Sequence, residues 1–356
     1  MKLKKATLAA AVTGLCAMGM AGQASAAIYG GAALDVKNLV ILIQDETSGA
    51  FIPATSFDFR TTTGSDLNDV LGAGDIKSCG GTPSANSCGG SGPAVVLNAL
   101  PSSIPGGVRV DNAFTFVGPS SADYGSADNV IWDAALAGDL TGTHTQGIAE
   151  AELTTGKSAG ATSTIRSTTG FTLTFAVAST GKLMLTADAD PDLYAELIDP
   201  LAKAGTASAS LSTSVRLAGT ITGGGSVTVN WAPNGDLVAA DCTKSGSASA
   251  GVLCSEVADD LNLNLSVSAP FGSSDGYSTE SGVGGTSAWT AGAAAADSWG
   301  KFGVSITGLP AGVYSLTLGN MQEANVTRVP EPGVLALLGL GLGGLGIMRR
   351  RKLAKA

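Results

Sequence analysis

Short segments in which apolar and polar residues alternate, separated by glycine-, serine- and threonine-rich stretches, run through the chain from about residue 27 to residue 327. Alternation with a period of two places the apolar side chains on one face of a β-strand, so each segment buries one side only. The clearest examples are 171–177, 209–221 and 261–267. Such strands, bounded by turn residues, predict an all-β body, either an antiparallel β-sandwich or a jelly roll. A β-solenoid is the alternative, but no fixed short repeat supports it.

The turn residues predict three hairpins, through Ser179–Gly181, through the glycines Gly223–Gly225 and through Gly308–Gly312. The apolar run Val36–Ile43 predicts a buried strand, and the glycine- and serine-rich segment 72–93 predicts a surface loop. Residues 123–140 fit either a short helix or a strand. The body, 27–327, is long enough for one large domain or two smaller ones.

The first 26 residues have the parts of a secretory signal peptide. Three lysines among the first five residues precede the apolar run Ala6–Met20, and Ala24 and Ala26 supply the small-x-small pattern that signal peptidase reads. The run of about 15 residues is shorter than the roughly 20 that a membrane anchor needs. We therefore expect cleavage after Ala26 and export across the inner membrane.

The net charge excludes one class of partner. Setting aside the three lysines of the signal peptide and five cations at the C-terminal end leaves twelve basic residues against 29 acidic ones, a charge near −17. Such a charge repels nucleic acid and favours solubility or association with cations. Nucleic-acid binding is therefore not expected.

Cysteine usage agrees with export, because four cysteines remain after the signal peptide is removed. Cys79 lies near Cys88 and Cys242 near Cys254, and short loops close most readily, so these two pairs are the expected disulfides. Zinc is the rival interpretation, but the spacings are not those of zinc ligands and no histidine lies nearby.

The last 29 residues, 328–356, form a second terminal signal. Pro330-Glu331-Pro332 precedes the uncharged run 333–348, and Arg349, Arg350 and Arg351 follow directly. The prolines favour an extended segment that a protease can reach. The 16-residue run would span about 24 Å as a helix, and the cations would stay on the cytoplasmic side as a stop-transfer cluster.

This order of motif, helix and arginine cluster resembles the PEP-CTERM sorting signal. The resemblance implies that exosortase recognises and cuts the tail in a Gram-negative bacterium, and that the tail helix holds the chain in the membrane until then. It further implies a location in the cell envelope, on the surface or in the extracellular matrix, where such proteins accompany biofilm polysaccharide. A plain C-terminal anchor with a proline linker is the alternative.

Three aspartates, Asp188, Asp190 and Asp192, alternate along the chain, so in an extended segment their carboxylates point the same way. They are the candidates for a calcium site, although neither the glycine nor the glutamate of an EF-hand loop accompanies them. No other cofactor is expected, and a solvated acidic turn is the alternative.

Two segments fit the GxSxG form of a hydrolase nucleophile, with Ser158 and Ser274 at the serine position. The chain has a single histidine, His144, which precedes both serines, whereas that hydrolase fold places its histidine after the nucleophile. A glycine- and serine-rich chain also matches this form by chance. We therefore expect no enzyme activity.

Trp231, Trp289 and Trp299 are candidates for stacking on sugar rings, with packing in the core as the favoured alternative. The sequence as a whole predicts a non-enzymatic surface or matrix protein. A carbohydrate-binding adhesin of the biofilm matrix is the second hypothesis.

Overall fold

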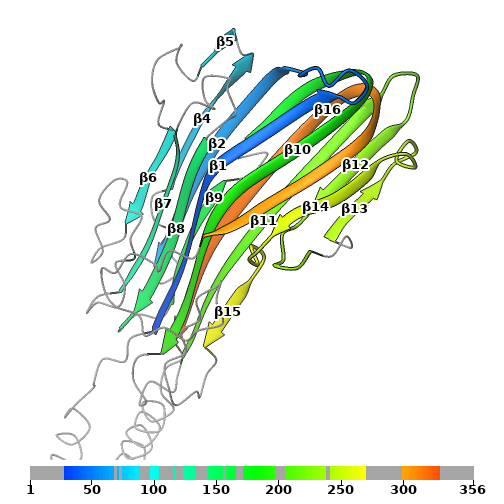
Figure 1. Ribbon diagram of the computed structural model, residues 1–356. Coiled ribbons are helices and arrows are strands. Elements are labelled where there is room, and N and C mark those ends of the chain that lie inside the picture. The colour runs from blue at the N-terminus through cyan, green and yellow to red at the C-terminus, as the bar shows by residue number, and fades with distance from the viewer. Residues whose placement is uncertain are drawn as a thin grey trace, which may run out of the picture.

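The structure is a computed structural model of the chain, and it describes residues 28–67, 70–71, 74–82, 84–87, 97–103, 116, 123–132, 143–154, 158–165, 171–197, 205–237, 241–269 and 299–328. These ranges contain sixteen β-strands joined in one connected sheet, and no α-helix (Figure 1). Their ladders are antiparallel, which confirms the predicted all-β, antiparallel class.

Two long strands, β10 (Phe171–Leu197) and β16 (Gly300–Arg328), hold the sheet together. They pair with each other from Phe171 opposite Leu318 to Ala189 opposite Gly300. In the middle of this ladder the register shifts on either side of Thr180 and Gly181, and both strands bend there together (Figure 1). The two halves of each strand therefore belong to two different layers.

The first layer contains the half of β10 before the bend and the half of β16 after it. On one side these strands continue into the edge formed by β2 and β4, and on the other into β11 and its neighbours. Its other strands are β2 (Ala54–Leu67), β3 (Val70–Leu71), β4 (Asp75–Thr82), β5 (Ala85–Asn86), β9 (Ser158–Ile165), β11 (Gly205–Ile221), β12 (Ser226–Trp231), β13 (Cys242–Ser245) and β15 (Ser266–Ala269).

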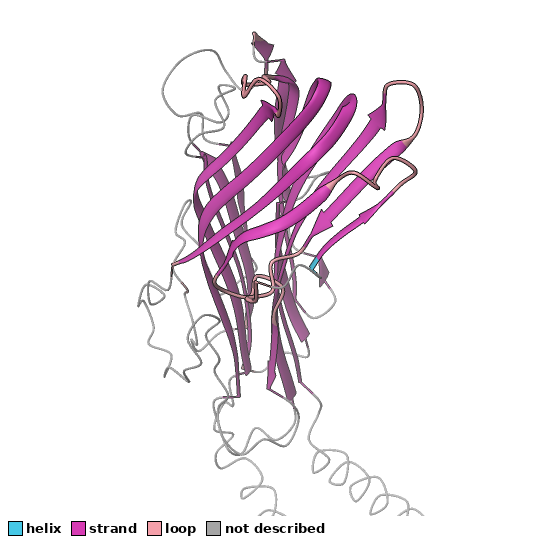
Figure 2. Cartoon of the chain, turned by 45° about the vertical axis from the view of Figure 1, so that its right-hand side comes forward, coloured by secondary structure: helices cyan, strands magenta, loops and turns pink. Residues whose placement is uncertain are grey.

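The second layer contains the other halves of β10 and β16, and it is continued by β1 on one side and β14 on the other. Figure 2 shows the two layers lying one behind the other. The remaining strands of this layer are β1 (Ile28–Asp45), β6 (Leu97–Ser103), β7 (Tyr124–Trp132), β8 (Thr143–Leu153) and β14 (Leu253–Asp259).

The faces that the two layers turn toward each other form the main core. Within the first layer, Phe175 on β10 stacks on its ladder partner Tyr314 of β16 with 5.5 Å between ring centroids, and the ring centroid of Phe59 on β2 lies 4.8 Å from that of Phe171. Buried apolar side chains of both layers belong to one cluster, and burying each large one contributes about 1.5–3 kcal/mol, so apolar contact holds the layers together.

Two predicted hairpins are wrong, because the same residues make the shared bend. No ladder among the described residues joins the two arms of β10 on either side of Ser179–Gly181, or the two arms of β16 on either side of Gly308–Gly312. Instead Thr180 lies opposite Pro310, and each arm of β10 pairs with the matching arm of β16. Turn residues mark where a strand reverses, but they do not say whether its arms pair with each other or with a neighbour.

The remaining predicted hairpin, through Gly223–Gly225, is confirmed. β11 and β12 pair from Thr220 opposite Ser226 to Val215 opposite Trp231. All three residues of the connecting triplet Gly223–Gly225 have positive φ angles between 88° and 107°, a conformation that glycine adopts at low cost. The expected strand Val36–Ile43 lies within β1, which begins eight residues earlier than predicted.

The predicted strand 261–267 is mostly wrong, since only residues 266 and 267 of it lie in a strand, β15. The side chain of Asn264 replaces the backbone ladder here: its amide accepts from the backbone N–H of Thr213 at 3.0 Å and donates to the carbonyl oxygens of Thr213 and Pro233. Leu263 is nevertheless buried, as its alternation predicted.

The segment 72–93 is less of a loop than predicted, because β4 and β5 lie within it. β4 pairs with β2 from Thr63 opposite Asp75 to Phe57 opposite Gly81 and extends the first layer. In 123–140 the strand alternative holds for the described part, which is β7.

The turn after β1 fastens the bend. Asp45, the last residue of β1, accepts hydrogen bonds from the Ser179 hydroxyl in β10 and from the backbone N–H groups of Thr47 and Ser48. These bonds, with Ser179 the strongest, lower the pKa of Asp45 to about 2. Glu46 continues the link, because its carboxylate accepts from the backbone N–H of Gly308 in β16 at 3.0 Å.

Replacing Gly308 with alanine is expected to destabilise the fold by about 2 kcal/mol or more, because a side chain at positive φ costs about 1–2 kcal/mol. The φ angle there is 71°, and an added Cβ would lie 2.3 Å from the carbonyl oxygen of Gly251. Urea denaturation measures the loss. The matched control is Gly64→Ala, where a Cβ meets nothing within 4 Å and the stability should stay within about 0.5 kcal/mol. Equal stabilities for the two variants would contradict this account of the bend.

Asp45→Asn is expected to lower the melting temperature at pH 7. Because the pKa of Asp45 is lower in the folded protein than the ordinary value of 3.8, its carboxylate stabilises the fold above that value, and the contribution is lost as the pH falls toward 2. Melting curves at pH 7, 4 and 2 should therefore show a difference between wild type and variant that closes at the lowest pH. A constant difference would show that Asp45 does not act through its charge.

Candidate functional site

The sorting signal predicted at the C-terminal end begins where the sheet ends. Arg328 is the last residue of β16 and still pairs with Gly205 of β11, while Thr327 pairs with Thr206 on one side and Ser158 on the other. Pro330, Glu331, Pro332 and the cluster Arg349–Arg351 lie outside the described residues, as do the expected signal cleavage site and the run 333–348. No helix in the described part of the chain is long and apolar enough to cross a membrane.

Both ends of the described body lie close together. Ile28, the first residue of β1, is fully buried, and its Cδ1 atom lies 2.0 Å from where a Cβ of Gly205 would stand. Gly205 is the ladder partner of Arg328, so the start of β1 and the end of β16 share one end of the molecule. The bend of β10 and β16 lies at the opposite end (Figure 1).

The outer face of the second layer carries a group of buried carboxylates. Glu150 and Glu152 on β8, Asp128 on β7, and Asp190 and Asp192 on β10 are all less than 7% exposed. The hydroxyl of Tyr29 on β1 donates to Glu150 at 2.8 Å, and a small apolar cluster packs among them. That cluster consists of Tyr29, Phe116, Tyr124, Ile148 and Tyr194.

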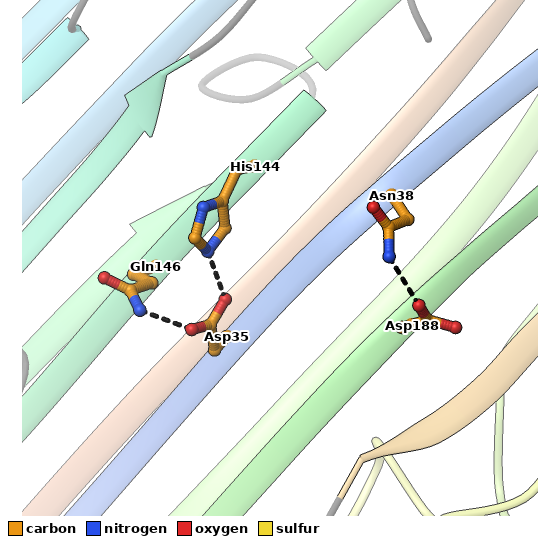
Figure 3. A network of polar contacts seen from close by, with 5 residues as sticks. All are labelled: Asp35, Asn38, His144, Gln146 and Asp188. Carbon is orange, nitrogen blue, oxygen red and sulfur yellow. Dashed lines mark hydrogen bonds and ion pairs between the residues drawn. The ribbon is translucent and has the colours of Figure 1, made fainter. Parts of the chain in front are cut away.

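The calcium candidates Asp188, Asp190 and Asp192 belong to this face, but they lie within strand β10 and not after it. Asp190 and Asp192 are buried, and Asp188 accepts a hydrogen bond from the Asn38 side chain at 2.7 Å (Figure 3). Asn38 itself has a φ of 55°, which asparagine tolerates, in a bulge of β1. The three do not form a metal-binding group of the kind described below.

His144 and Gln146 on β8 both point toward Asp35 on β1 (Figure 3). The Nε2 atom of His144 lies 2.6 Å from Oδ1 of Asp35, and the Gln146 amide donates to the other carboxylate oxygen. The histidine thus has a carboxylate partner within the sheet.

Of the two GxSxG serines, Ser158 is the first residue of β9, where its backbone pairs with Thr327, and Ser274 lies outside the described residues. A nucleophile elbow needs a serine on a turn between a strand and a helix. The described part of the chain contains no α-helix, so Ser158 lacks that setting.

The tryptophans that were candidates for sugar stacking differ in how exposed they are. Trp231 is 2% exposed, so core packing and not sugar stacking is its role. Trp299 is half-buried and lies under the Lys37 ammonium, which is 3.2 Å from the ring centroid. Trp289 lies outside the described residues.

The predicted disulfide between Cys242 and Cys254 is present, with 6.0 Å between the two Cα atoms. Because Cys242 is on β13 and Cys254 on β14, it joins the two layers across an edge. Cys79 is also disulfide-bonded, and its predicted partner, Cys88, lies outside the described residues.

An acidic group that was not predicted lies at this edge. Carboxylate oxygens of Asp236, Asp241 and Glu256 lie within 4.8 Å of one another. Burial first, and then repulsion from neighbouring carboxylates, raises the pKa values of Glu256 and of Asp259. No spacing in the sequence signals this group, because its members come together only when β13 and β14 face each other.

Comparison with known proteins adds information on the tail alone. Residues 328–352 match the family model of the PEP-CTERM protein-sorting motif. No curated protein sequence matches the chain.

Two solved structures of infectious bursal disease virus align with the chain. The Gx strain structure is 10% identical over 93% of this chain and 76% of its own, with a TM-score of 0.11. The Gt strain structure is 11% identical over 87% of this chain and 68% of its own, with a TM-score of 0.10. Similarity this low carries no argument about the fold.

The motif match agrees in position with the three-part tail of the sequence and with the end of the sheet at Arg328. A motif of this kind marks proteins that are exported to the envelope or surface of Gram-negative bacteria and processed by exosortase. By its C-terminal residues, the chain is an exported protein with a PEP-CTERM sorting motif.

Proposed function

We propose that the chain is a non-enzymatic structural protein of the cell surface or extracellular matrix, cut by exosortase at Pro330-Glu331-Pro332. The observation that carries the proposal is the boundary at Arg328, where the sheet ends and the sorting motif begins. Pro330 and Pro332 lack the backbone N–H that a further ladder pair would need. Cutting there would remove no residue of the described sheet.

The position of the two ends supports an orientation during export. Before processing, the segment preceding Ala26 and the run 333–348 would both lie in the inner membrane, the first until signal peptidase cuts it. Since Ile28 and Arg328 share one end of the body, both attachments fit the same end. The bend of β10 and β16 would then face away from the membrane.

The chemistry of the described residues favours a structural role. Of the two serines that fit a nucleophile motif, Ser158 begins strand β9 and does not lie on the strand–helix turn of a nucleophile elbow. Carbohydrate binding as an adhesin of the biofilm matrix is the finer alternative, with extracellular polysaccharide as the partner. Trp231 offers it no stacking surface, so Trp299 is the tryptophan that a test of this alternative would change.

For the architecture, we propose two stacked sheets, as in a β-sandwich or a jelly roll. The support is the pair of layers with one apolar core between them, joined by the bent strands β10 and β16. One core also favours a single large domain.

Glu331→Ala is expected to block processing. In cells with exosortase, the variant should remain in the membrane fraction at the length of the unprocessed chain, whereas wild type appears in a shorter form at the surface. Immunoblots of cell fractions, with protease shaving of intact cells, make the comparison. Glu323→Ala, a glutamate eight residues upstream in β16, is the matched control and should be processed like wild type. Normal processing of Glu331→Ala would refute the proposed cleavage motif.

A further inference from the structure

The acidic group of Asp236, Asp241 and Glu256 lies at the open edge of the body, where β12 and β13 of the first layer face β14 of the second (Figure 1). Calcium binds oxygen ligands at about 2.3–2.6 Å, so two oxygens on one ion are at most about 5 Å apart. The spacing of 4.8 Å or less among the three carboxylates satisfies this limit. Asp236 is exposed and the other two are half-buried, so an ion can enter from solvent.

Buried oxygens without partners provide a second, independent observation. Asp259 is only 3% exposed; its Oδ2 atom accepts from the backbone N–H groups of Asn234 and Gly235, but its Oδ1 atom has no hydrogen-bond partner. Oδ2 of Asp241 and Oε2 of Glu256 are also buried without a partner. Buried carboxylate oxygens normally have hydrogen bonds or a cation.

In the part of the chain that the structure describes, neither lysine nor arginine forms an ion pair with Asp241, Glu256 or Asp259. Asp236, Asp241 and Glu256 have carboxylate oxygens within 4.8 Å of one another, so their charges repel unless a cation lies between them.

The fold prepares this arrangement. In β14 the register shifts between Glu256 and Ala258, so Glu256 lies opposite Val304 and Asp259 opposite Phe302. Because Val304 and Phe302 are two positions apart, this bulge puts Glu256 and Asp259 on the same face, although they are three positions apart in the chain. The indole N–H of Trp231 donates to Glu256 at 2.8 Å and fixes its orientation.

The disulfide holds the other side of the group. Cys242 follows Asp241 directly, and its partner, Cys254, precedes Glu256 by two residues. These cysteines are thus unavailable as thiolate ligands, and the remaining donors are oxygen atoms, which suit calcium and not zinc.

From this geometry we propose that Asp236, Asp241 and Glu256, with Asp259 behind them, form a calcium site that joins the two layers at their open edge. Bound calcium would connect the loop before β13 to β14, beside the covalent link. Extracellular modules bind calcium with dissociation constants of about 10⁻⁴–10⁻³ M, which is the range expected for a site in an exported protein.

The test is a calorimetric titration of the full chain, purified in detergent and freed of metal by chelation, with calcium chloride. Wild type should bind calcium with a dissociation constant of about 1 mM or lower. Asp241→Asn and Glu256→Gln should each weaken binding at least about tenfold, the effect of losing about 1.4 kcal/mol. Asp236→Asn changes an exposed side chain, so it should weaken binding without disturbing folding.

Two controls locate the ion. Asp58→Asn, on β2, and Asp188→Asn, the candidate from sequence spacing, should bind calcium like wild type. The mass of each variant after thiol alkylation shows whether the disulfide has formed and the edge has folded. The proposal is overturned if wild type binds no calcium up to 10 mM, well above the range of extracellular modules. Undiminished binding by correctly folded Asp236→Asn, or loss of binding in Asp188→Asn alone, would also overturn it.

Discussion

The antiparallel ladder between β10 and β16 is the constraint on which the rest of the structure depends. The ladder continues through the bend, so its two halves lie in different layers. It therefore fixes which strands of one layer face which strands of the other. β1 and β2 attach to β10 on opposite sides of the bend, and β14 and β11 attach to β16 in the same way. The main core forms because this paired bend brings two amphipathic faces together.

Period-two alternation correctly predicted strands at 171–177 and 209–221, failed for most of 261–267, and gave no information on which strands pair. The triplet Gly223–Gly225 predicted a hairpin correctly, because its arms pair with each other. Similar turn residues occur at Ser179–Gly181 in β10 and at Gly308–Gly312 in β16. These two segments form neighbouring bends, and the arms of β10 pair with the arms of β16 and not with each other. Whether a turn segment makes a hairpin or a shared bend depends on contacts between segments more than 100 residues apart. The residues of the turn itself do not show which distant segment will pair with its arms.

The acidic residues show the same limit. Asp188, Asp190 and Asp192 alternate as predicted, but two of them are buried in the sheet face and the third is bound to Asn38. The group of Asp236, Asp241 and Glu256 has no regular spacing, and it depends on a bulge in β14 and on the facing of two layers. The C-terminal sorting motif, in contrast, is a linear pattern, so it was predicted from the sequence and is matched by the family model.

We propose that the folded β body is delivered with both terminal segments removed. Intact-mass measurement of the protein released from cells that contain exosortase tests both ends at once. The released chain is expected to begin at Ala27 and to end close to Pro330–Pro332, with the disulfide between Cys242 and Cys254 in place. A mass that includes residues 333–356 would contradict it and would leave an exported protein that keeps its tail.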